Sequence, residues 1–466
     1  MDISGTTLGP EVLVELDRNL TVPLHRQLTD ALRDAIRAGR LAAEVRMPSS
    51  RVLASDLRVS RRMVVDAYAQ LVAEGFLVGR HGAGTYVAAV DTVPMVPATG
   101  RPAAGRHDVD FCSGHPDLRS FPRAEWLRAV RQGLADLPAA SFGYVEPQGL
   151  TVTRVALADY LRRTRGVHAE PERIVLCAGV TQAVGLVAKV LQRAGAAGFA
   201  VEEPGFWLHR FVLQHNGCSP QPIRVDDAGL DVAILAAGPA DIVLTTPAHQ
   251  SPTGVVLTPQ RRGELLQWAR AGNLVIEDDY DAEYRYERRP VGALQGLAPD
   301  RVIYLGSVSK TLAPGLRIGW MVLPEDLVGA VTREKGLAGV GNSATDQAAF
   351  AHLLTSGEYD RHLRQMRRRY LSRRNTLLDS LSRYFPEVSV LGAPAGVQLM
   401  AQFPDSTDID ALVTAADKLG VRVESVAPFY ADRSAAPPGL LLGYANVTES
   451  QIAAGIETLA RAVRPR

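Results

Sequence analysis

Lys310 stands among residues that could bind a phosphorylated aldehyde. The segment 305–320 reads LGSVSKTLAPGLRIGW, so Ser307 and Ser309 precede the lysine and Arg317 follows it. An amine forms a Schiff base with an aldehyde, whereas a guanidinium stays protonated and does not. Serine hydroxyls and an arginine are ligands for a phosphate dianion. Pyridoxal 5′-phosphate requires both features, so we expect Lys310 to form the Schiff base and Ser307, Ser309 and Arg317 to anchor the phosphate.

A second requirement of this cofactor is a carboxylate that keeps its pyridine nitrogen protonated, because that charge makes the ring an electron sink. The sequence EDDY at 277–280 ends an apolar run upstream of Lys310. Alone, an acidic strand end is typical of a metal site, an ion pair or a solvated turn. In combination with the lysine segment, we expect Asp278 to pair with the nitrogen and Tyr280 to reach the ring hydroxyl.

Lysine is rare in this chain, although lysine and arginine together number 51. Sites that need only a solvated cation have therefore mostly become arginine, and each lysine is a candidate for amine chemistry. The other lysines are Lys189, Lys335 and Lys418. They lie in helical patterns without phosphate ligands beside them, so we expect them to be exposed to solvent.

The composition describes a globular protein of more than one domain. The 466 residues are 46% hydrophobic and 22% charged, with a formal net charge of +1, so affinity for nucleic acid must come from a local patch. We expect no membrane span and no secretory signal, and hence a cytoplasmic protein. Cys112, Cys177 and Cys218 lack metal-ligand spacing and are expected to be small buried side chains.

The elements at the start of the chain predict a winged helix-turn-helix. Apolar side chains recur at helical spacing from Leu24 to near Gly39, and two more helical patterns cover 51–57 and 61–74. Two short apolar runs, 76–78 and 85–87, then flank a glycine-rich tip, which is typical of a hairpin. In such a fold the second helix of the motif enters the major groove. We therefore expect Ser60, Arg61 and Arg62 to reach DNA.

A proline-rich stretch without periodicity follows, and we interpret residues 89–108 as a linker between a DNA-binding domain over 1–88 and a second domain over 109–466. In the second domain short β-rich runs alternate with helical patterns, which predicts an α/β domain with a largely parallel sheet. The runs are 173–177, 240–245, 274–277 and 301–305. From about 370 to 466 the pattern favours a smaller α+β lobe.

The first domain closely resembles the GntR superfamily of bacterial regulators over about residues 20–88. The resemblance rests on PLHRQL at 23–28, MPSSRVLA at 47–54, VSRRMV at 59–64 and GAGTYV at 82–87. It implies contacts between DNA and the second and third helices, and between DNA and a glycine-containing wing. The residues expected to take part are Ser50, Arg51, Ser60, Arg61, Arg62, Arg80, Gly82 and Gly84.

The second domain resembles the fold type I aminotransferases over about residues 108–462. The segment CAGVTQA at 177–183 is similar to their glycine turn at a helix start, so Val180 and Thr181 would hold phosphate by backbone amides. The segment EPGF at 203–206 makes Phe206 the expected stacking partner of the pyridine ring. Ser251 stands where these enzymes have an asparagine, which leaves one contact to the ring hydroxyl open.

The tandem order resembles the MocR-type regulators over nearly the whole chain. This resemblance implies a transcription regulator that binds operator DNA, pyridoxal phosphate and sometimes a small amine or amino acid. Its target genes would belong to vitamin B6 or amino-acid metabolism. It also implies a domain-swapped homodimer, in which Tyr144 would reach the cofactor phosphate of the partner subunit.

The effector and the activity stay open at this point. Members that respond to an amino acid tend to carry an arginine near Leu441, but the segment 439–444 here is GLLLGY and holds no cation. His209, Arg210 and Arg422 are alternative cations. We therefore favour pyridoxal phosphate itself as the signal. The rival hypotheses are a catalytic aminotransferase with an appended DNA-binding domain, and a dimerisation scaffold that has lost its ligand.

Overall fold

The computed structural model describes residues 16–18, 22–37, 39–80, 84–89, 107–144, 146–286, 292–339, 341–392 and 394–463. The chain forms two compact units, Met1–Ala104 and Gly105–Arg466. In the described residues, no helix combines the length and the apolar character that a membrane crossing requires.

The first unit is a winged helix, as the sequence predicts. Its elements are α1 (Leu24–Arg37), α2 (Ser50–Asp56), α3 (Arg61–Ala73), β1 (Leu77–Arg80) and β2 (Gly84–Val87). Ser49 and Ser60 cap α2 and α3, because their hydroxyls accept hydrogen bonds from the N–H groups of Val52 and Met63. The apolar stripe of each helix closes over one small core, whose fully buried members include Leu28, Leu32, Val64 and Leu71. The strands pair antiparallel to form the wing.

The second unit contains an eight-stranded sheet in the order β4-β11-β10-β9-β8-β5-β6-β7. Neighbouring strands from β6 to β10 run parallel, while β11 lies antiparallel to both of its neighbours. The strands are β4 (Ile174–Cys177), β5 (Phe199–Glu203), β6 (Gln221–Asp226), β7 (Gly229–Leu230), β8 (Ile242–Thr245), β9 (Leu274–Asp278), β10 (Val302–Ser307) and β11 (Gly319–Val322). The largely parallel sheet expected from the sequence is thus confirmed.

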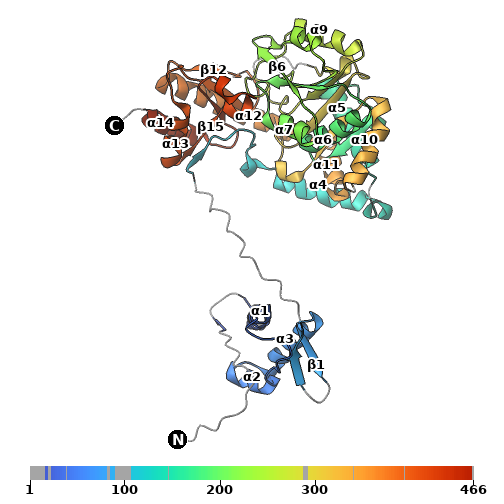
Figure 1. Ribbon diagram of the computed structural model, residues 1–466, viewed down its shortest axis with the longest axis vertical. Coiled ribbons are helices and arrows are strands. Elements are labelled where there is room, and N and C mark those ends of the chain that lie inside the picture. Colours follow the sequence, from blue (N-terminus) through green and yellow to red (C-terminus); the bar gives the residue numbers. More distant parts are fainter. Residues whose placement is uncertain are drawn as a thin grey trace. The chain divides into compact units, whose positions relative to one another are not determined.

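Helices cover both faces of this sheet because successive side chains of each strand point to opposite sides. Leu176, Tyr304 and Trp320 pack with the helices of one face, and Cys177, Leu305 and Met321 pack with those of the other. The first face carries α4 (Arg123–Asp136), α5 (Thr151–Arg165), α8 (Val232–Ala237), α9 (Pro259–Arg270) and α11 (Ala344–Thr355). The second carries α6 (Val180–Arg193), α7 (Trp207–His215) and α10 (Glu325–Ala338) (Figure 1).

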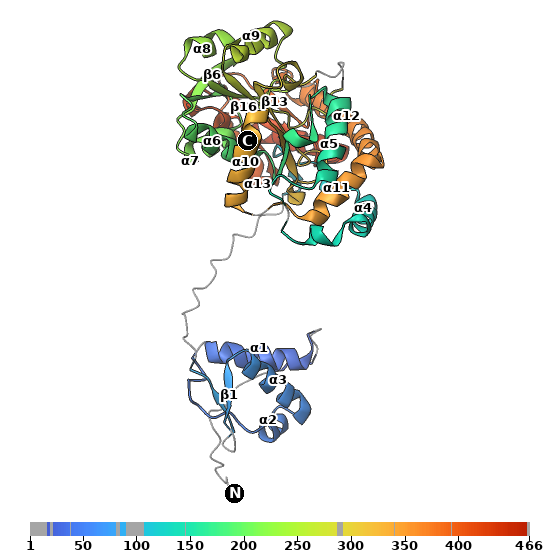
Figure 2. The same cartoon turned by 90° about the vertical axis from the view of Figure 1, so that its right-hand side faces the viewer.

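The small C-terminal lobe is built on a four-stranded sheet in the order β12-β13-β16-β15. The strands are β12 (Ser389–Leu391), β13 (Gln398–Gln402), β15 (Glu424–Ser425) and β16 (Gly439–Gly443). The helices are α12 (Glu358–Tyr384), α13 (Ile409–Lys418) and α14 (Glu449–Val463). The start of the lobe expected from the sequence, at about residue 370, falls within α12. β14 (Val421–Arg422) pairs in parallel with β3 (Val109–Asp110) at the start of the unit. Figure 2 shows α12 beside α11 and α5 along one side of the unit.

The carboxyl ends of the central strands meet at one edge of the large sheet. Asp278 ends β9 and lies opposite Leu305 of the parallel strand β10, which continues to Ser307. Ligands of open α/β sheets bind in the crevice outside these strand ends. The expected cofactor residues are therefore brought to one place by the topology.

Candidate functional site

A cavity of about 370 Å³ lies at this edge, between the large sheet and the small lobe, and we call it the Lys310 cavity. It is lined by the residues of this chain that the sequence predicts to bind the cofactor in the same subunit. They are Val180, Thr181, Phe206, Asp278, Tyr280, Ser307, Ser309, Lys310 and Arg317. Tyr144 does not line the cavity; it is 96% exposed, just after a short 3-10 helix at Ala139–Phe142.

Lys310 follows β10, and its Nζ atom donates a hydrogen bond to the carbonyl oxygen of Gly114 at 2.7 Å. Burial lowers the pKa of Lys310 below its ordinary value, although Asp281 and Asp278 act in the opposite direction. Loss of the proton leaves a nucleophilic amine, which is the form that attacks an aldehyde. A Cβ at Gly114 would lie 3.1 Å from Nζ, and this glycine has φ +80°, so its chain passes very close to the amine.

Asp278 presents one carboxylate oxygen without a protein partner. Its Oδ2 lies 3.1 Å from Nε2 of His209, at ion-pair distance but without the angle of a hydrogen bond. Its Oδ1 is buried and has no hydrogen-bond partner among the described residues. A buried unpaired carboxylate oxygen is costly, so it indicates a ligand that supplies a proton. A protonated pyridine nitrogen meets that need.

The opposite part of the cavity suits a phosphate. α6 begins at Val180 after Gly179, whose φ of 108° is unfavourable for other residues. The first N–H groups of a helix have no partner inside the helix and carry partial positive charge, so they favour an anion. A Cβ at Gly179 would lie 3.5 Å from Nη1 of Arg317, which places the guanidinium beside this helix start. Ser307 and Ser309 line the same cavity.

Tyr280 belongs to a group of contacting buried polar side chains. The sequence predicted Tyr280 as a site residue, but not His249 and Asp281. The hydroxyl of Tyr280 is 3.1 Å from Nδ1 of His249, and the same nitrogen is 3.0 Å from Oδ2 of Asp281. Burial, together with the nearby carboxylate of Asp281, raises the pKa of Tyr280 well above its ordinary value. The phenol therefore keeps its proton and can donate it to an oxygen of a ligand. Ser251 lines the same cavity.

Phe206 precedes α7 and is held by two other aromatic side chains. Its ring centroid lies 5.1 Å from that of His209, edge to face, and 6.5 Å from that of Phe429. Phe206 and Phe429 both line the Lys310 cavity. The site thus offers an aromatic wall against which a flat ring can stack.

The expectation that Lys335 is exposed to solvent is wrong. Lys189 and Lys418 are exposed as expected, but Lys335 is only 2% exposed, and its Nζ donates to the carbonyl oxygen of Pro147 at 2.5 Å. Burial lowers the pKa of Lys335 to about 8. The helical period already pointed to this, since Lys335 follows the buried Val331 by four positions on α10.

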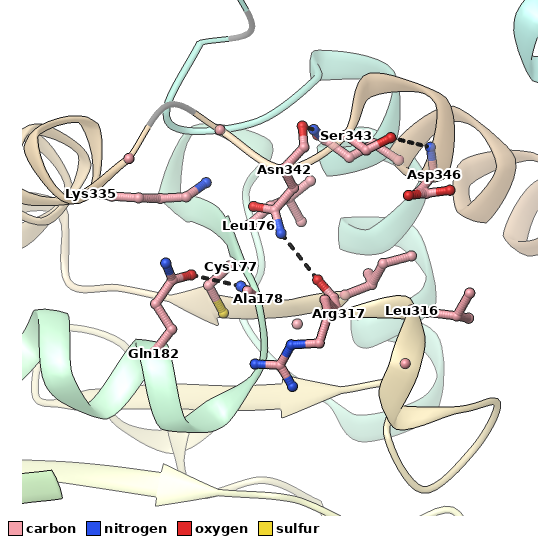
Figure 3. Close-up of a pocket in the computed structure, with 16 residues that line it drawn as sticks. Leu176, Cys177, Ala178, Gln182, Leu316, Arg317, Lys335, Asn342, Ser343 and Asp346 are labelled. Atoms are coloured by element: carbon pink, nitrogen blue, oxygen red, sulfur yellow. Dashed lines mark hydrogen bonds between the residues drawn. The ribbon is translucent and has the colours of Figure 1, made fainter. Parts of the chain in front are cut away.

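Lys335 lines a second hollow, which has a volume of about 390 Å³. Arg317 and Asn342 line the same hollow (Figure 3). The amide of Asn342 donates to the carbonyl oxygen of Arg317 at 3.1 Å. This bond lies on the backbone of Arg317, a residue whose φ of 53° is left-handed, and it helps to hold that conformation. Arg317 therefore borders both the hollow and the Lys310 cavity.

His209, Arg210 and Arg422, the candidate cations in place of an arginine near Leu441, have different positions. His209 lines the Lys310 cavity, whereas Arg210 pairs with Glu203 at 3.4 Å and Arg422 pairs with Asp110 at 3.6 Å. Leu441 is fully buried in β16. Among the described residues that line the cavity, Arg317 is the only arginine.

In the first unit, the residues expected to contact DNA lie at the start of two helices and on the wing. Nε of Arg61 is 3.4 Å from the hydroxyl of Ser50, and the side chain of Arg62 is 91% exposed. Arg51 is exposed and Ser60 caps α3.

On the wing, Arg80 pairs with Glu44 and lies over the ring of Tyr86 at 4.5 Å. Gly84 has φ +110°, and a Cβ there would lie 3.2 Å from Nε of Arg46, an arginine that the site prediction omitted. Gly82 is outside the described residues, as is most of the linker expected at 89–108.

Comparison with known families agrees with this two-part architecture. The description "Bacterial regulatory proteins, gntR family" matches residues 24–87, and "Aminotransferase class I and II" matches residues 106–459. The fold of the second part implies pyridoxal 5′-phosphate as its cofactor. The unpaired oxygen of Asp278, the close approach of Gly179 to Arg317 and the amine of Lys310 fit that group.

Full-length relatives share the same order of parts. The chain is 33% identical to the probable rhizopine catabolism regulatory protein MocR of Rhizobium meliloti, over 96% of this chain and 95% of that protein. It is 31% identical to the pyridoxine biosynthesis transcriptional regulator PdxR of Corynebacterium glutamicum, over 91% and 93%.

Solved structures resemble the second part. An archaeal alanine:glyoxylate aminotransferase matches with a TM-score of 0.71 and 25% identity, over 76% of this chain and 90% of that one. The kynurenine aminotransferase of Pyrococcus horikoshii matches with a TM-score of 0.70 and 27% identity, over 77% and 91%.

Proposed function

Because the chain belongs to the MocR-type transcription regulators, in which a GntR winged helix precedes an aminotransferase domain, we propose that its second domain senses pyridoxal phosphate and sets the affinity of the first for operator DNA. The observation that carries the proposal is the Lys310 cavity, which is lined both by Lys310, whose pKa is lowered by burial, and by Asp278, which has one unpaired carboxylate oxygen. These groups suit the two ends of the cofactor's ring system.

Each residue has a defined part in this proposal. Lys310 binds the cofactor covalently, Asp278 holds the pyridine nitrogen, and Tyr280 donates to the ring hydroxyl. Phe206 stacks on the ring. The phosphate is held by Ser307, Ser309, Arg317 and the first N–H groups of α6 at Val180 and Thr181. When bound, the cofactor supplies an aldehyde that captures amines.

We also propose that the protein works as a domain-swapped homodimer. The Tyr144 ring is exposed, so it is available to contact the cofactor site of a second copy of the chain. In that arrangement Tyr144 of the partner subunit contacts the phosphate next to Arg317. A regulator that reads chromosomal DNA acts in the cytoplasm, on the nucleoid.

The target genes are proposed from the relatives. One relative is a pyridoxine biosynthesis transcriptional regulator, and another is a probable rhizopine catabolism regulatory protein. Leu441 and the lack of a second arginine in the described lining of the Lys310 cavity argue against an amino acid held by its carboxylate. We therefore favour genes of vitamin B6 supply, controlled by the cofactor or by an adduct that it forms with an amine.

The alternative is a catalytic aminotransferase with an appended DNA-binding domain. The observation in its favour is the lowered pKa of Lys310, because a neutral lysine is also a general base. Steady turnover of a common amino acid with an oxo acid by the purified chain would favour this alternative. A chain that binds no cofactor at all would favour a scaffold.

The deciding experiment measures the affinity of the full chain for its own promoter DNA, with and without pyridoxal phosphate. We expect the dissociation constant to change for the wild type and to stay constant for Lys310→Ala. Equal affinities for the wild type in both conditions, with the cofactor spectroscopically bound, would refute the sensor function. Fluorescence anisotropy with labelled duplex DNA measures each dissociation constant in a separate titration.

A further inference from the structure

The small lobe brings a carboxylate to the position where an amino-acid sensor would need a cation. Glu424 of β15 lies directly opposite Leu441 of the antiparallel strand β16. Side chains of such a pair point to the same face of the sheet. Leu441 packs there with Met400, Val426 and Phe429, and Phe206 of the cavity packs against this cluster. The face that carries Leu441 and Glu424 is thus the face toward the cofactor.

Glu424 itself lines the Lys310 cavity. Its Oε2 accepts hydrogen bonds from the hydroxyl of Ser113 at 2.8 Å and from the N–H of Ser113 at 3.4 Å. The next residue, Gly114, accepts the hydrogen bond of Lys310. Two adjacent residues, Ser113 and Gly114, therefore contact Glu424 and the reactive amine of Lys310.

Within the described ranges, Glu424 forms no ion pair. Across the described part of the chain, no lysine, arginine or histidine lies within ion-pair distance of its carboxylate. A carboxylate has about four acceptor sites, and Ser113 contacts only one of its two oxygens, so Glu424 can accept further hydrogen bonds. Gln398, which is buried and lines the same cavity, adds an amide oxygen.

Besides Glu424, the described lining of the cavity carries Asp278, Lys310, Arg317 and two histidines, His115 and His209. Arg317 stands at the start of α6, and His209 stands beside Asp278. A ligand that carries a carboxylate toward the small lobe would meet Glu424 with the same sign of charge. The one arginine of the described lining, Arg317, lies beside Gly179 at the start of α6. A ligand that carries an ammonium group there would form a charge-assisted hydrogen bond.

We propose that the effector is an aliphatic diamine without a carboxylate, with one amino group directed to the cofactor and the other to Glu424. This rests on the proposed binding of pyridoxal phosphate at Lys310. The diamine replaces the Lys310 nitrogen at the cofactor's carbonyl carbon, so that one carbon–nitrogen double bond forms as the other breaks. Of the three protons on the incoming ammonium, two pass to Lys310 and one stays, so no further reactant is needed.

Three probes of equal chain length test the charge at the far end of the ligand. They are 1,4-diaminobutane, n-butylamine and 4-aminobutanoate, which end in an ammonium, a methyl group and a carboxylate. Each is titrated into the cofactor-loaded full chain, and binding is followed by the change in near-visible absorption. We expect 1,4-diaminobutane to bind at least about tenfold more tightly than n-butylamine, and 4-aminobutanoate to bind most weakly.

Variants of Glu424 assign the preference to this side chain. Glu424→Gln should remove the advantage of 1,4-diaminobutane over n-butylamine, and Glu424→Lys should reverse the order in favour of 4-aminobutanoate. Glu457→Gln, which changes an exposed carboxylate on α14, is the matched control and should keep the wild-type order.

The outcomes separate the two levels of the proposal. Wild-type chain without near-visible absorption after incubation with the cofactor would refute the sensor function itself. Normal absorption with equal affinity for all three probes, or tighter binding of 4-aminobutanoate, would refute only the diamine assignment. An unchanged order in Glu424→Lys would likewise refute the role of Glu424.

Discussion

Nε2 of His209 lies 3.1 Å from Oδ2 of Asp278, while Oδ1 of the same carboxylate has no partner among the described residues. Both side chains are buried, so the imidazole fixes the orientation of a carboxylate that water cannot stabilise freely. The paired oxygen holds Asp278 in place, and the unpaired oxygen remains for a ligand. The contact with His209 thus helps to stabilise a buried carboxylate that keeps one oxygen for a ligand.

Asp278→Asn is expected to weaken cofactor binding by about 10- to 100-fold. The amide keeps the shape of the side chain but removes the charge that stabilises a protonated ring nitrogen, and a hydrogen bond to a charged group contributes about 1.5–3 kcal/mol. Absorption titration of the purified chain with pyridoxal phosphate measures the change. Asp379→Asn, at an exposed position of α12, should bind like the wild type. Equal affinity in both variants would remove Asp278 from the site.

Lys310→Ala is expected to lose the near-visible absorption of the bound cofactor without unfolding the chain. Borohydride treatment followed by peptide mass spectrometry should find the cofactor on Lys310 in the wild type and on no residue in the variant. Lys335→Met is the informative control, because burial also lowers the pKa of Lys335 and makes it the other candidate nucleophile. An adduct that survives in Lys310→Ala and disappears in Lys335→Met would show that the wrong lysine was chosen.

The sequence predicted the parts of the site that lie close together along the chain. Ser307, Ser309, Lys310 and Arg317 follow one strand, and Asp278 ends the strand next to it, so local chemistry and strand order were sufficient. The winged helix was predictable for the same reason, since helix caps and apolar periodicity are local signals.

The missed parts depend on contacts between distant segments. Ser113 meets Glu424 and Gly114 meets Lys310 only after the small lobe folds back on the large sheet. The antiparallel orientation of β11 was also not predicted, because a short apolar run does not encode its direction. Lys335 was predicted wrongly for another reason: the general preference of lysine for solvent outweighed a helical spacing that pointed inward.

Lys335 is expected to make the stability of the second unit depend on pH. In the folded chain its pKa is lowered to about 8, from an ordinary value of 10.5. Below about pH 8 both states are protonated and the folded state bears the full cost of the buried charge. Between about pH 8 and 10.5 the folded state has released a proton that the unfolded state still holds, so stability rises with pH.

Lys335→Met should abolish this rise, which can reach about 3 kcal/mol over the whole window. Urea unfolding of wild type and variant from pH 7 to pH 10 measures the difference between the two free energies of unfolding. Other groups titrate in both proteins and cancel in that difference. Lys189→Met, at an exposed position of α6, should keep the wild-type slope. A slope that is unchanged in Lys335→Met would show that this amine is not desolvated in solution.

Arg61→Ala is expected to weaken binding to a specific operator by about 1–3 kcal/mol, or roughly 5- to 150-fold. The reason is the position of Arg61 at the start of α3, where the first residues of a recognition helix face the major groove. Nε of Arg61 also lies 3.4 Å from the hydroxyl of Ser50, so α2 helps to orient the guanidinium. Electrophoretic retardation of promoter DNA measures the affinity, and Arg40→Ala, an exposed arginine after α1, is the matched control.

The salt dependence of the same binding reaction distinguishes two kinds of contact for Arg61. If the guanidinium neutralises a phosphate, the variant should lower the slope of log affinity against log salt concentration by about 1, equally for operator and unrelated DNA. If it reads a base edge, the variant should lose affinity for the operator alone and keep the wild-type slope. The exposed start of α3 and the bond to Ser50 favour base reading, because a tethered guanidinium is better placed for bidentate contact than a free one. Unchanged operator affinity in Arg61→Ala would contradict both possibilities and remove Arg61 from the DNA contact surface.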